Sequence, residues 1–402
     1  MSDPISLIST WFHNLLLGWG LPEGLVNFIG DFIGAGVVAT VAMLVVIVLI
    51  WVERKVAGRM QDRFGPNRAG PYGLLQPIAD VIKIMTKELI TPDGADLIPY
   101  NFAPILSVAA VLLIWAVVPF ASTVVGTDIH VGALYIIAVG SFGIVAVLMA
   151  GWSSDNKFAL LGAARAVAQM VSYEVPMVLA LLIPVLLAGS MGLTSIVAAQ
   201  NVWFIVLAPI AALVFLIASM AEVGRAPFDL LEAESEIVAG FHTEYSGMKF
   251  GMFYVGEFLH VFTIGALIAT FFLGGWRGWG AETYPILGFV YFYAKAFLGY
   301  FVITWIRLTV PRIRIDHMLA FSWKFLTPLI LAALMVTAVL VKMLEDANVW
   351  VYSLGLLVAN ILLIWATVEI LKWLERNRTP RRQTFKGRPV AVAPKSSTSA
   401  NS

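Results

Sequence analysis

The sequence predicts an all-α protein that crosses a membrane many times. Apolar runs of about 20 residues recur along the chain, and each is long enough to span a hydrocarbon core as a helix. Charged residues make up only 13% of the 402 residues, against about 25% in soluble domains, and the mean hydropathy is +0.87. The short alternating segments of membrane β-barrels do not occur. The predicted fold class is therefore a polytopic helical membrane protein with long loops.

Nine apolar runs are long enough to span, eight of them in a core and one near the C-terminus. The predicted spans are 32–52, 101–120, 132–152, 172–189, 202–221, 253–274, 286–308, 324–344 and 350–373. The chain accordingly divides into an N-terminal interfacial segment (1–31), a core membrane domain (32–345), an extra C-terminal transmembrane helix (346–375) and a disordered basic tail (376–402).

Lysine and arginine are concentrated in alternate loops. Seven of them follow the first span, from Arg54 to Lys87, whereas the loops after the second, fourth and eighth spans have none. By the positive-inside rule the N-terminus lies outside and the C-terminus lies in the cytoplasm, and an odd number of spans agrees with this. The predicted cytoplasmic loops are 53–100, 152–171, 222–252 and 309–323.

The composition excludes several functions for this chain. It has no Cys, so it cannot hold Cys-ligated iron–sulfur clusters, and any electron carrier of that kind belongs to another subunit. A net charge of +1 provides no basic field for nucleic acid. No phosphate-binding glycine loop and no metal-ligand motif occurs, so we predict neither a nucleotide site nor a metal site.

An amphipathic helix is predicted within the first cytoplasmic loop, over 74–89. Its apolar face carries Leu74, Ile78, Ile82, Met85 and Leu89, and its polar face carries Gln76, Asp80, Lys83 and Lys87. At about 15 residues such a helix is too short to span and suits the membrane interface. It is either a structural collar or the lip of an entrance for a lipophilic ligand.

The segment after the fifth span concentrates acids that only Arg225 balances nearby. Pro227 starts a predicted helix on which Asp229, Glu232 and Glu236 share one face. Two carboxylates about 6 Å apart repel by roughly 3 kcal/mol at an effective dielectric of about 20. The cluster therefore either docks basic residues of a partner or stores protons and titrates as a group.

Ionisable residues also occur inside the predicted spans. Glu174 and Glu257 are two of them, His260 follows Glu257 by one turn, and Lys295 lies in the seventh span. A charge at mid-membrane costs from about 2.5 to 10 kcal/mol, so these groups are functional candidates. Arg307, at the inner end of the seventh span, is expected to extend to the interface instead.

Four long cytoplasmic segments carry a specific pattern. They read ERKVAGRMQDRFGPNRAGPYGLLQPIADVIK, GWSSDNKFALLGAARAVAQMVSYE, AEVGRAPFDLLEAESEIVAGFHTEYSGMKF and RLTVPRIRIDHM. In this order they resemble the H subunit of bacterial proton-pumping NADH:quinone oxidoreductase, the counterpart of subunit 1 of mitochondrial complex I. The resemblance runs from about Glu53 to Pro328, and the ninth span and the basic tail lie outside it.

The resemblance implies a subunit of the bacterial cell (inner) membrane, placed where the membrane arm meets the peripheral arm. It implies a quinone cavity shared with peripheral-arm subunits, while NADH, FMN and iron–sulfur clusters belong to partner subunits and no complete catalytic site lies in this chain alone. The implied cavity and loop residues are Arg54, Gln61, Arg63, Asp80, Arg225, Asp229, Glu232 and Glu234. The implied proton-coupling residues, leading toward small membrane-arm and antiporter-like pump subunits, are Glu174, Glu222 and Glu257.

Two other classes of protein remain open. A membrane anchor of an energy-converting hydrogenase-type complex would not use quinone, and the complete first loop disfavours it. A stand-alone carrier is disfavoured because the spans show no inverted repeat and the long charged loops suit protein partners. Bound quinone would exclude the first class, and activity of the isolated chain would favour the second.

Overall fold

The computed structural model describes residues 4–230, 238–344 and 348–377, and in these it contains helices and no strand. Eight helices of the described residues are long and apolar enough to cross a membrane, which confirms the predicted fold class. The chain divides into two units, Met1–Ile361 and Leu362–Ser402. The second unit holds the end of the last helix. Of the predicted basic tail (376–402), residues 378–402 lie outside the described residues.

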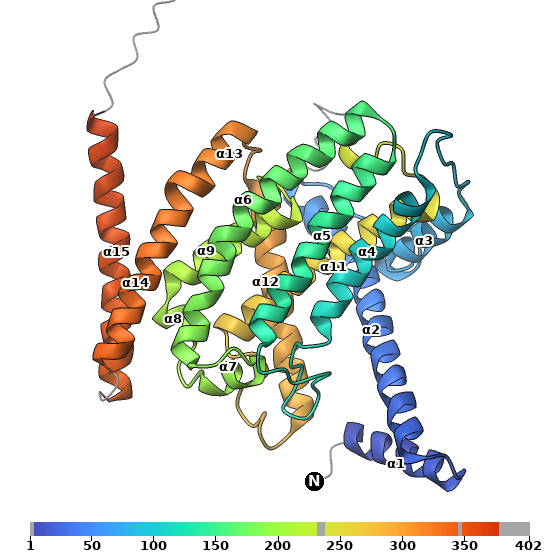
Figure 1. Ribbon diagram of the computed structural model, residues 1–402, viewed down its shortest axis with the longest axis horizontal. Helices are drawn as coiled ribbons and strands as arrows, with labels where there is room; N and C mark the ends of the chain where they lie inside the picture. Colours follow the sequence, from blue (N-terminus) through green and yellow to red (C-terminus); the bar gives the residue numbers. More distant parts are fainter. Residues whose placement is uncertain (1–3, 231–237, 345–347, 378–402) are drawn as a thin grey trace, which may run out of the picture. The chain divides into compact units, whose positions relative to one another are not determined.

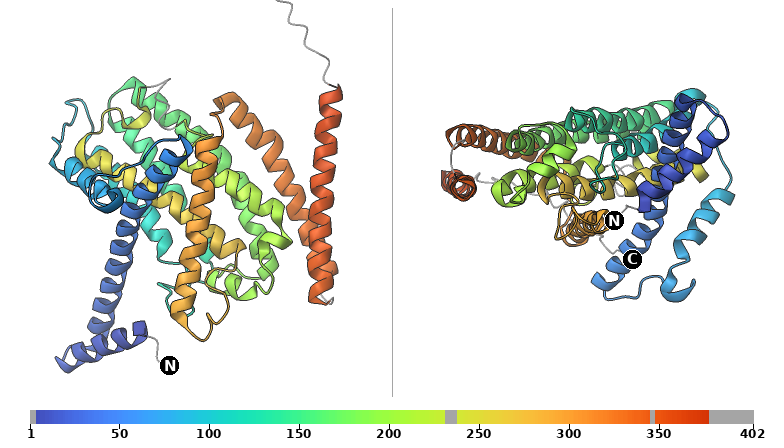
Figure 2. Two further views of the ribbon diagram at one scale, coloured as in Figure 1. Left: turned by 180° about the vertical axis from the view of Figure 1, so that it is seen from behind. Right: turned by 90° about the horizontal axis from the view of Figure 1, so that it is seen from below.

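The N-terminal part is formed by helices α1 to α3. Helix α1 (Pro4–Gly18) runs across one end of α2 (Glu23–Met60), as Figures 1 and 2 show. Helix α2 extends beyond the predicted span at both ends and continues through the basic residues that follow it. After the short turn η1 (Pro71–Gly73), α3 (Gln76–Thr86) confirms a helix within the predicted range 74–89, starting two residues later and ending three residues earlier.

Helices α4 to α6 follow the predicted pattern with one difference. Helices α4 (Leu97–Trp115) and α5 (Gly132–Ser153) match the second and third predicted spans. Helix α6 (Lys157–Ala188) is continuous over 32 residues, so most of the predicted loop 152–171 is helical. The side chain of Asn156 caps its N-terminus by accepting a hydrogen bond of 2.8 Å from the backbone N–H of Phe158.

The fifth predicted span, 202–221, is broken. After α7 (Leu193–Ala199), the chain forms α8 (Phe204–Leu207) and then α9 (Pro209–Val223). Proline has no N–H to continue a helix, and Ala208 leaves helical geometry at φ −135° and ψ 63°. The 15 residues of α9 measure about 22 Å along the helix axis, less than the roughly 30 Å of a hydrocarbon core.

Helix α11 (Gly247–Phe272) is the most deeply buried of the eight long helices of the described residues. It packs against α4 and against α12 (Pro285–Thr309) (Figure 1). A Cβ at Gly265 would lie 2.5 Å from the carbonyl oxygen of Ala296, so glycine permits the close approach of α11 and α12. The Trp115 indole N–H donates a buried hydrogen bond of 2.6 Å to Thr263, which ties α4 to α11.

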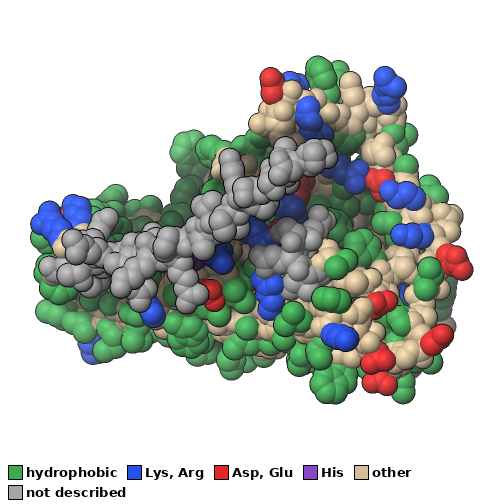
Figure 3. All heavy atoms as spheres, turned by 90° about the horizontal axis from the view of Figure 1, so that it is seen from above, with side chains coloured by type: hydrophobic (Ala, Val, Ile, Leu, Met, Phe, Trp, Pro, Cys, Tyr) green, Lys and Arg blue, Asp and Glu red, His purple; other side chains and the backbone are tan. Residues whose placement is uncertain are grey.

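The remaining helices are α13 (Ile315–Phe321), η3 (Ser322–Leu326), α14 (Thr327–Met343) and α15 (Val349–Asn377). The described parts of the four predicted cytoplasmic loops lie at the same end of the first unit, the upper end in Figure 1. Figure 3 views this end and shows acidic and basic side chains gathered on it. The helices run in directions that agree with the predicted alternation of successive loops between the two sides of the membrane. Which side of the membrane this end faces stays a prediction.

Candidate functional site

A buried arginine joins three parts of the chain. Nη1 of Arg225 donates a hydrogen bond of 3.1 Å to Oε1 of Glu53, near the end of α2. Its Nε forms an ion pair of 2.7 Å with Oε1 of Glu257 on α11, and its guanidinium lies 4.6 Å from the centre of the Phe258 ring. The Arg225 side chain is 4% exposed, so these partners, rather than bulk water, balance its charge.

Glu53 is a site residue that the sequence pattern did not predict. Its carboxylate also accepts a hydrogen bond from Arg307 and one of 3.1 Å from the Tyr300 hydroxyl, both on α12. The expectation that Arg307 extends to the interface is wrong, because its guanidinium turns inward to Glu53. The ion cluster is defined as Glu53, Arg225, Glu257 and Arg307. The available signal was an acid at the end of an apolar run, directly before two basic residues.

Gln169, on α6, holds the turn that presents Arg225. Its Nε2 donates hydrogen bonds to the carbonyl oxygens of Ala221, at 2.6 Å, and Phe228, at 2.7 Å. These acceptors lie on either side of Arg225 in the sequence, and the Gln169 side chain is buried. The two bonds therefore fix the backbone between the end of α9 and the ion cluster.

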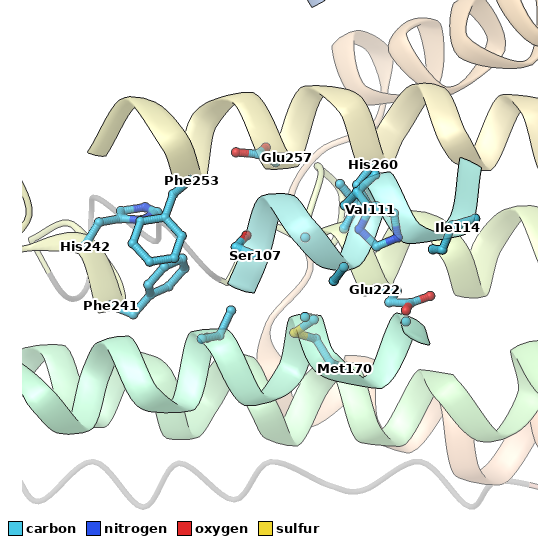
Figure 4. Close-up of a pocket in the computed structure, with 17 residues that line it drawn as sticks. Ser107, Val111, Ile114, Met170, Glu222, Phe241, His242, Phe253, Glu257 and His260 are labelled. Atoms are coloured by element: carbon cyan, nitrogen blue, oxygen red, sulfur yellow. The ribbon is translucent and has the colours of Figure 1, made fainter. Parts of the chain in front are cut away.

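A cavity lies beside the ion cluster, between α4, α5, α6, α9 and α11; its lining is mostly apolar but includes four ionisable side chains, and it is named the polar cavity for them. Its volume, counted as space open to the centres of water molecules, is about 70 Å³. One water needs roughly 10–15 Å³ on that measure, so the cavity has room for several. Its ionisable lining residues are Glu222, Glu257, His242 and His260. Figure 4 shows His242 toward one end and Glu222 with His260 toward the other.

His242 lies in the 3₁₀ turn η2 (Gly240–His242) and packs against the rings of Phe250 and Phe253. Neither ring nitrogen has a hydrogen-bond partner among the described residues, although the side chain is only 8% exposed. Burial lowers the pKa of the His242 imidazole to about 4, so the ring is neutral near pH 7. A neutral imidazole has one donor and one acceptor, and both remain for water in the cavity.

The structure brings together the three acids predicted for proton coupling. Glu222 and Glu257 line the polar cavity from α9 and α11. Glu174, on α6, does not line it, and its Oε1 accepts a hydrogen bond of 2.9 Å from Ser141 of α5. Gly140, the residue before Ser141, faces Glu222, since a Cβ there would lie 3.7 Å from its Oε1. Glu174 and Glu222 are therefore close enough to repel each other electrostatically.

The four first-loop residues predicted as cavity residues form two local pairs outside the ion cluster. Nη1 of Arg54 lies 2.5 Å from Oδ2 of Asp80, which joins the end of α2 to α3. Nε of Arg63 donates a hydrogen bond of 2.7 Å to Oε1 of Gln61. Burial raises the pKa of the Asp80 carboxyl, but the hydrogen bond and charge of Arg54, with Lys83 nearby, outweigh it and hold that pKa below its usual value.

The acidic segment after α9 is described only in part. Asp229 is partly buried and follows the buried ring of Phe228. Glu232 and Glu234, together with Glu236, lie outside the described residues. The prediction that Asp229, Glu232 and Glu236 share a helix face therefore stays a prediction.

Lys295 has a structural role. Its ammonium donates hydrogen bonds to three backbone carbonyls, those of Leu273 (2.8 Å), Gly275 (2.9 Å) and Arg277 (2.8 Å). It also lies 5.5 Å from the centre of the Trp203 ring. The ammonium thus satisfies carbonyl groups at the C-terminal end of α11, which accounts for a charge inside the seventh predicted span.

Helices long and apolar enough to cross a membrane, with an ion cluster and a cavity buried between them, define a polytopic membrane protein with ionisable groups inside its helix bundle. The family model for NADH dehydrogenase matches residues 33–338. The chain belongs to this family and, within it, to the H subunits of the NADH-quinone oxidoreductases.

Similar relatives share this description. An NADH-quinone oxidoreductase H subunit of Dehalococcoides mccartyi (strain CBDB1) is 52% identical over 303 residues, covering 75% of this chain and 84% of the relative. One of Bacteroides thetaiotaomicron is 44% identical over 347 residues, covering 83% and 96%. The H subunit numbered 2 of Geobacter sulfurreducens is 47% identical over 300 residues, covering 72% and 89%. The matched region includes the ion cluster and the polar cavity, because both lie within 33–338.

Proposed function

We propose that this chain is a membrane subunit of a proton-translocating NADH:quinone oxidoreductase that forms the quinone entrance and part of the quinone cavity. In this proposal it couples quinone reduction to proton movement through Glu257, Glu222 and Glu174. One observation carries the proposal. Arg225 contacts both Glu53, in the last turns of α2, and Glu257, which lines the polar cavity.

The coupling follows from this shared arginine. Reduction of a quinone to a quinol takes up electrons and protons, which changes the charge near the loops that enclose it. Such a change alters the electrostatic attraction between Arg225 and Glu53 or other loop residues. It therefore also alters how strongly Arg225 stabilises the ionised form of Glu257. Two sites that bias one shared element are coupled, and a coupling of about 1–3 kcal/mol is typical.

The proposed partners follow from what this chain lacks. With no Cys, it holds no Cys-ligated iron–sulfur cluster, so the clusters, FMN and the NADH site are assigned to peripheral-arm subunits. Quinone is assigned as the substrate bound between those subunits and this chain's loops. Small membrane-arm subunits and antiporter-like pump subunits are the proposed partners within the bilayer.

The direct test is Glu222→Gln in the complex reconstituted into lipid vesicles. Glutamine keeps the shape of the side chain but cannot carry a proton. We expect proton translocation to fall below detection while the complex assembles. Glu282→Gln is the matched control, because Glu282 is 73% exposed and its ion pair with Arg277 is long, at 3.6 Å. Normal translocation in Glu222→Gln would refute the coupling role.

The entrance is tested at two exposed apolar side chains, Leu74 just before α3 and Ile78 within it. Leu74 is 51% exposed and Ile78 is 43% exposed, so tryptophan at either position should obstruct a lipophilic tail. We expect the apparent KM for a long-tailed quinone to rise about fivefold, which corresponds to about 1 kcal/mol, with a smaller rise for a short-tailed quinone. Lys87→Trp, at an exposed residue just after α3, is the control. Equal KM values across tail lengths in the Leu74 and Ile78 variants would contradict the entrance.

The proposed orientation places the N-terminus outside and the C-terminus in the cytoplasm of a bacterial cell. The chain has no native Cys, so single cysteines report on it cleanly. In intact cells, we expect a membrane-impermeant thiol reagent to label Thr283→Cys in the loop between α11 and α12, and not Ser396→Cys in the tail. Labelling of Ser396→Cys alone would show the opposite orientation.

The alternative function is a membrane anchor of an energy-converting hydrogenase-type complex. The relatives named above are all described as H subunits of NADH-quinone oxidoreductases, which favours quinone as the substrate. Loss of activity on adding a quinone-site inhibitor to the purified complex would support the quinone proposal, and insensitivity would support the alternative.

A further inference from the structure

His260 is an ionisable residue of the polar cavity that the proposed coupling does not use. It lies on α11, one helical turn after Glu257. Figure 4 shows it beside Val111 and Ile114 of α4, at the end of the cavity where Glu222 lies. Placing a polar imidazole among mostly apolar side chains inside a membrane protein costs free energy, so His260 is a candidate for a functional role.

The position of His260 relative to the carboxylates of Glu257 and Glu222 indicates what that role is. Residues three apart on a helix are neighbours, with Cβ atoms about 5–6 Å apart, so His260 and Glu257 lie on one face of α11. Glu222 reaches the same end of the cavity from α9. Glu257 forms an ion pair with Arg225, whereas Glu222 faces Gly140 of α5. His260 therefore lies between the carboxylate of the ion cluster and the carboxylate that leads toward Glu174.

An independent observation indicates that the cavity contains water. His242, toward the other end, is 8% exposed and has no hydrogen-bond partner for either ring nitrogen among the described residues. Buried polar groups of this kind are satisfied by ordered water where space allows, and the cavity has space for several molecules. Apart from the two histidines and the two glutamates, the described lining holds no ionisable side chain.

We propose that His260 relays protons between Glu257 and Glu222, directly or through one bridging water. This inference rests on the proposed function. In one passage the carboxyl of Glu257 gives its proton to one ring nitrogen, and the other ring nitrogen gives its proton to the carboxylate of Glu222. The imidazole returns to its neutral form as the other tautomer, and rotation of the ring restores it. One proton moves between two carboxylates, and nothing is oxidised or reduced.

The test compares His260→Gln with His260→Glu in the complex reconstituted into lipid vesicles. Glutamine fills the site but cannot exchange a proton, whereas glutamate can. We expect His260→Gln to lower the rate of proton translocation by about tenfold or more, and His260→Glu to restore more than half of the loss. The pH optimum of His260→Glu should move down, because a carboxyl titrates about two pH units below an imidazole. His130→Gln, at an exposed histidine, is the matched control.

The outcomes separate the relay from the proposed function. A normal rate in His260→Gln overturns the relay, and so does an equal loss in the Gln and Glu variants, which would mark a structural role. If His260→Gln does not assemble, His260→Asn replaces it, with the same expected loss. Translocation that persists in Glu222→Gln overturns the proposed function itself. Translocation lost in Glu222→Gln but normal in His260→Gln overturns only the relay.

Discussion

Replacing Glu257 with glutamine is expected to abolish proton translocation and to slow quinone reduction, with the complex still assembled. Glu257 belongs to both the ion cluster and the polar cavity, so it is the one acid that both parts of the site share. The amide cannot release a proton to the cavity and does not balance the charge of Arg225. A positioned acid or base contributes about 100-fold or more to a proton-transfer step, so we expect a loss of at least about 100-fold in translocation rate.

The measurement is the number of protons moved per quinone reduced, together with the turnover rate, in reconstituted vesicles. Glu282→Gln is again the control, because it removes an exposed carboxylate whose surface ion pair contributes about 0–1 kcal/mol at most. A Glu257→Gln complex that retains normal stoichiometry would show that the contact between Arg225 and Glu257 is not part of the coupling route.

Among these substitutions, replacing Arg225 with methionine is expected to cause the largest loss of thermal stability of the complex. Methionine fills the space of the side chain without its charge, so Glu257 loses this ion-pair partner and Glu53 keeps Arg307 and Tyr300. Removing one member of a buried ion pair costs about 3–5 kcal/mol, and the Glu257 side chain is 23% exposed, so we expect a loss toward the lower end of that range. The midpoint of thermal unfolding of the purified complex should fall accordingly.

A double variant shows whether the loss of the ion pair between Arg225 and Glu257 is the cause. Glu257→Gln added to Arg225→Met removes the carboxylate, so part of the lost stability should return, and the two changes should not be additive. Lys372→Met is the control, since Lys372 is 53% exposed and its 3.1 Å pair with Glu369 lies at the surface. Equal unfolding midpoints for Arg225→Met and Lys372→Met would contradict the role of the ion cluster.

Local sequence patterns predicted most of the architecture. Hydropathy identified the spanning helices because each must be apolar over its own length, whatever its neighbours are. The amphipathic pattern over 74–89 identified α3, because opposite faces of a helix meet different surroundings. The break at Pro209 was not predicted, because the run 202–221 is apolar throughout and was interpreted as one span, although proline ends a helix through its own covalent structure.

Contacts between distant residues could not be predicted in this way. Glu53 and Arg225 are 172 residues apart and meet only because α2, α9, α11 and α12 converge. Arg307 was expected at the interface, yet it turns inward to Glu53. A charged residue inside a span has the same sequence pattern whether it caps a helix or belongs to a coupling site. Lys295 caps α11, whereas Glu257 joins the ion cluster to the cavity.

The sequence alone therefore established the helical membrane class, the spans other than the fifth, the alternation of charged loops and the acids that adjoin or interrupt the apolar runs. All of these depend on the chemistry of residues that are adjacent or one turn apart. The tertiary structure decided which charges pair, that Glu53 is among them, and that Glu222, Glu257, His242 and His260 surround one cavity. The reason is that apolar helix surfaces carry little information about their neighbours, so the packing of the helices determines which buried polar groups meet.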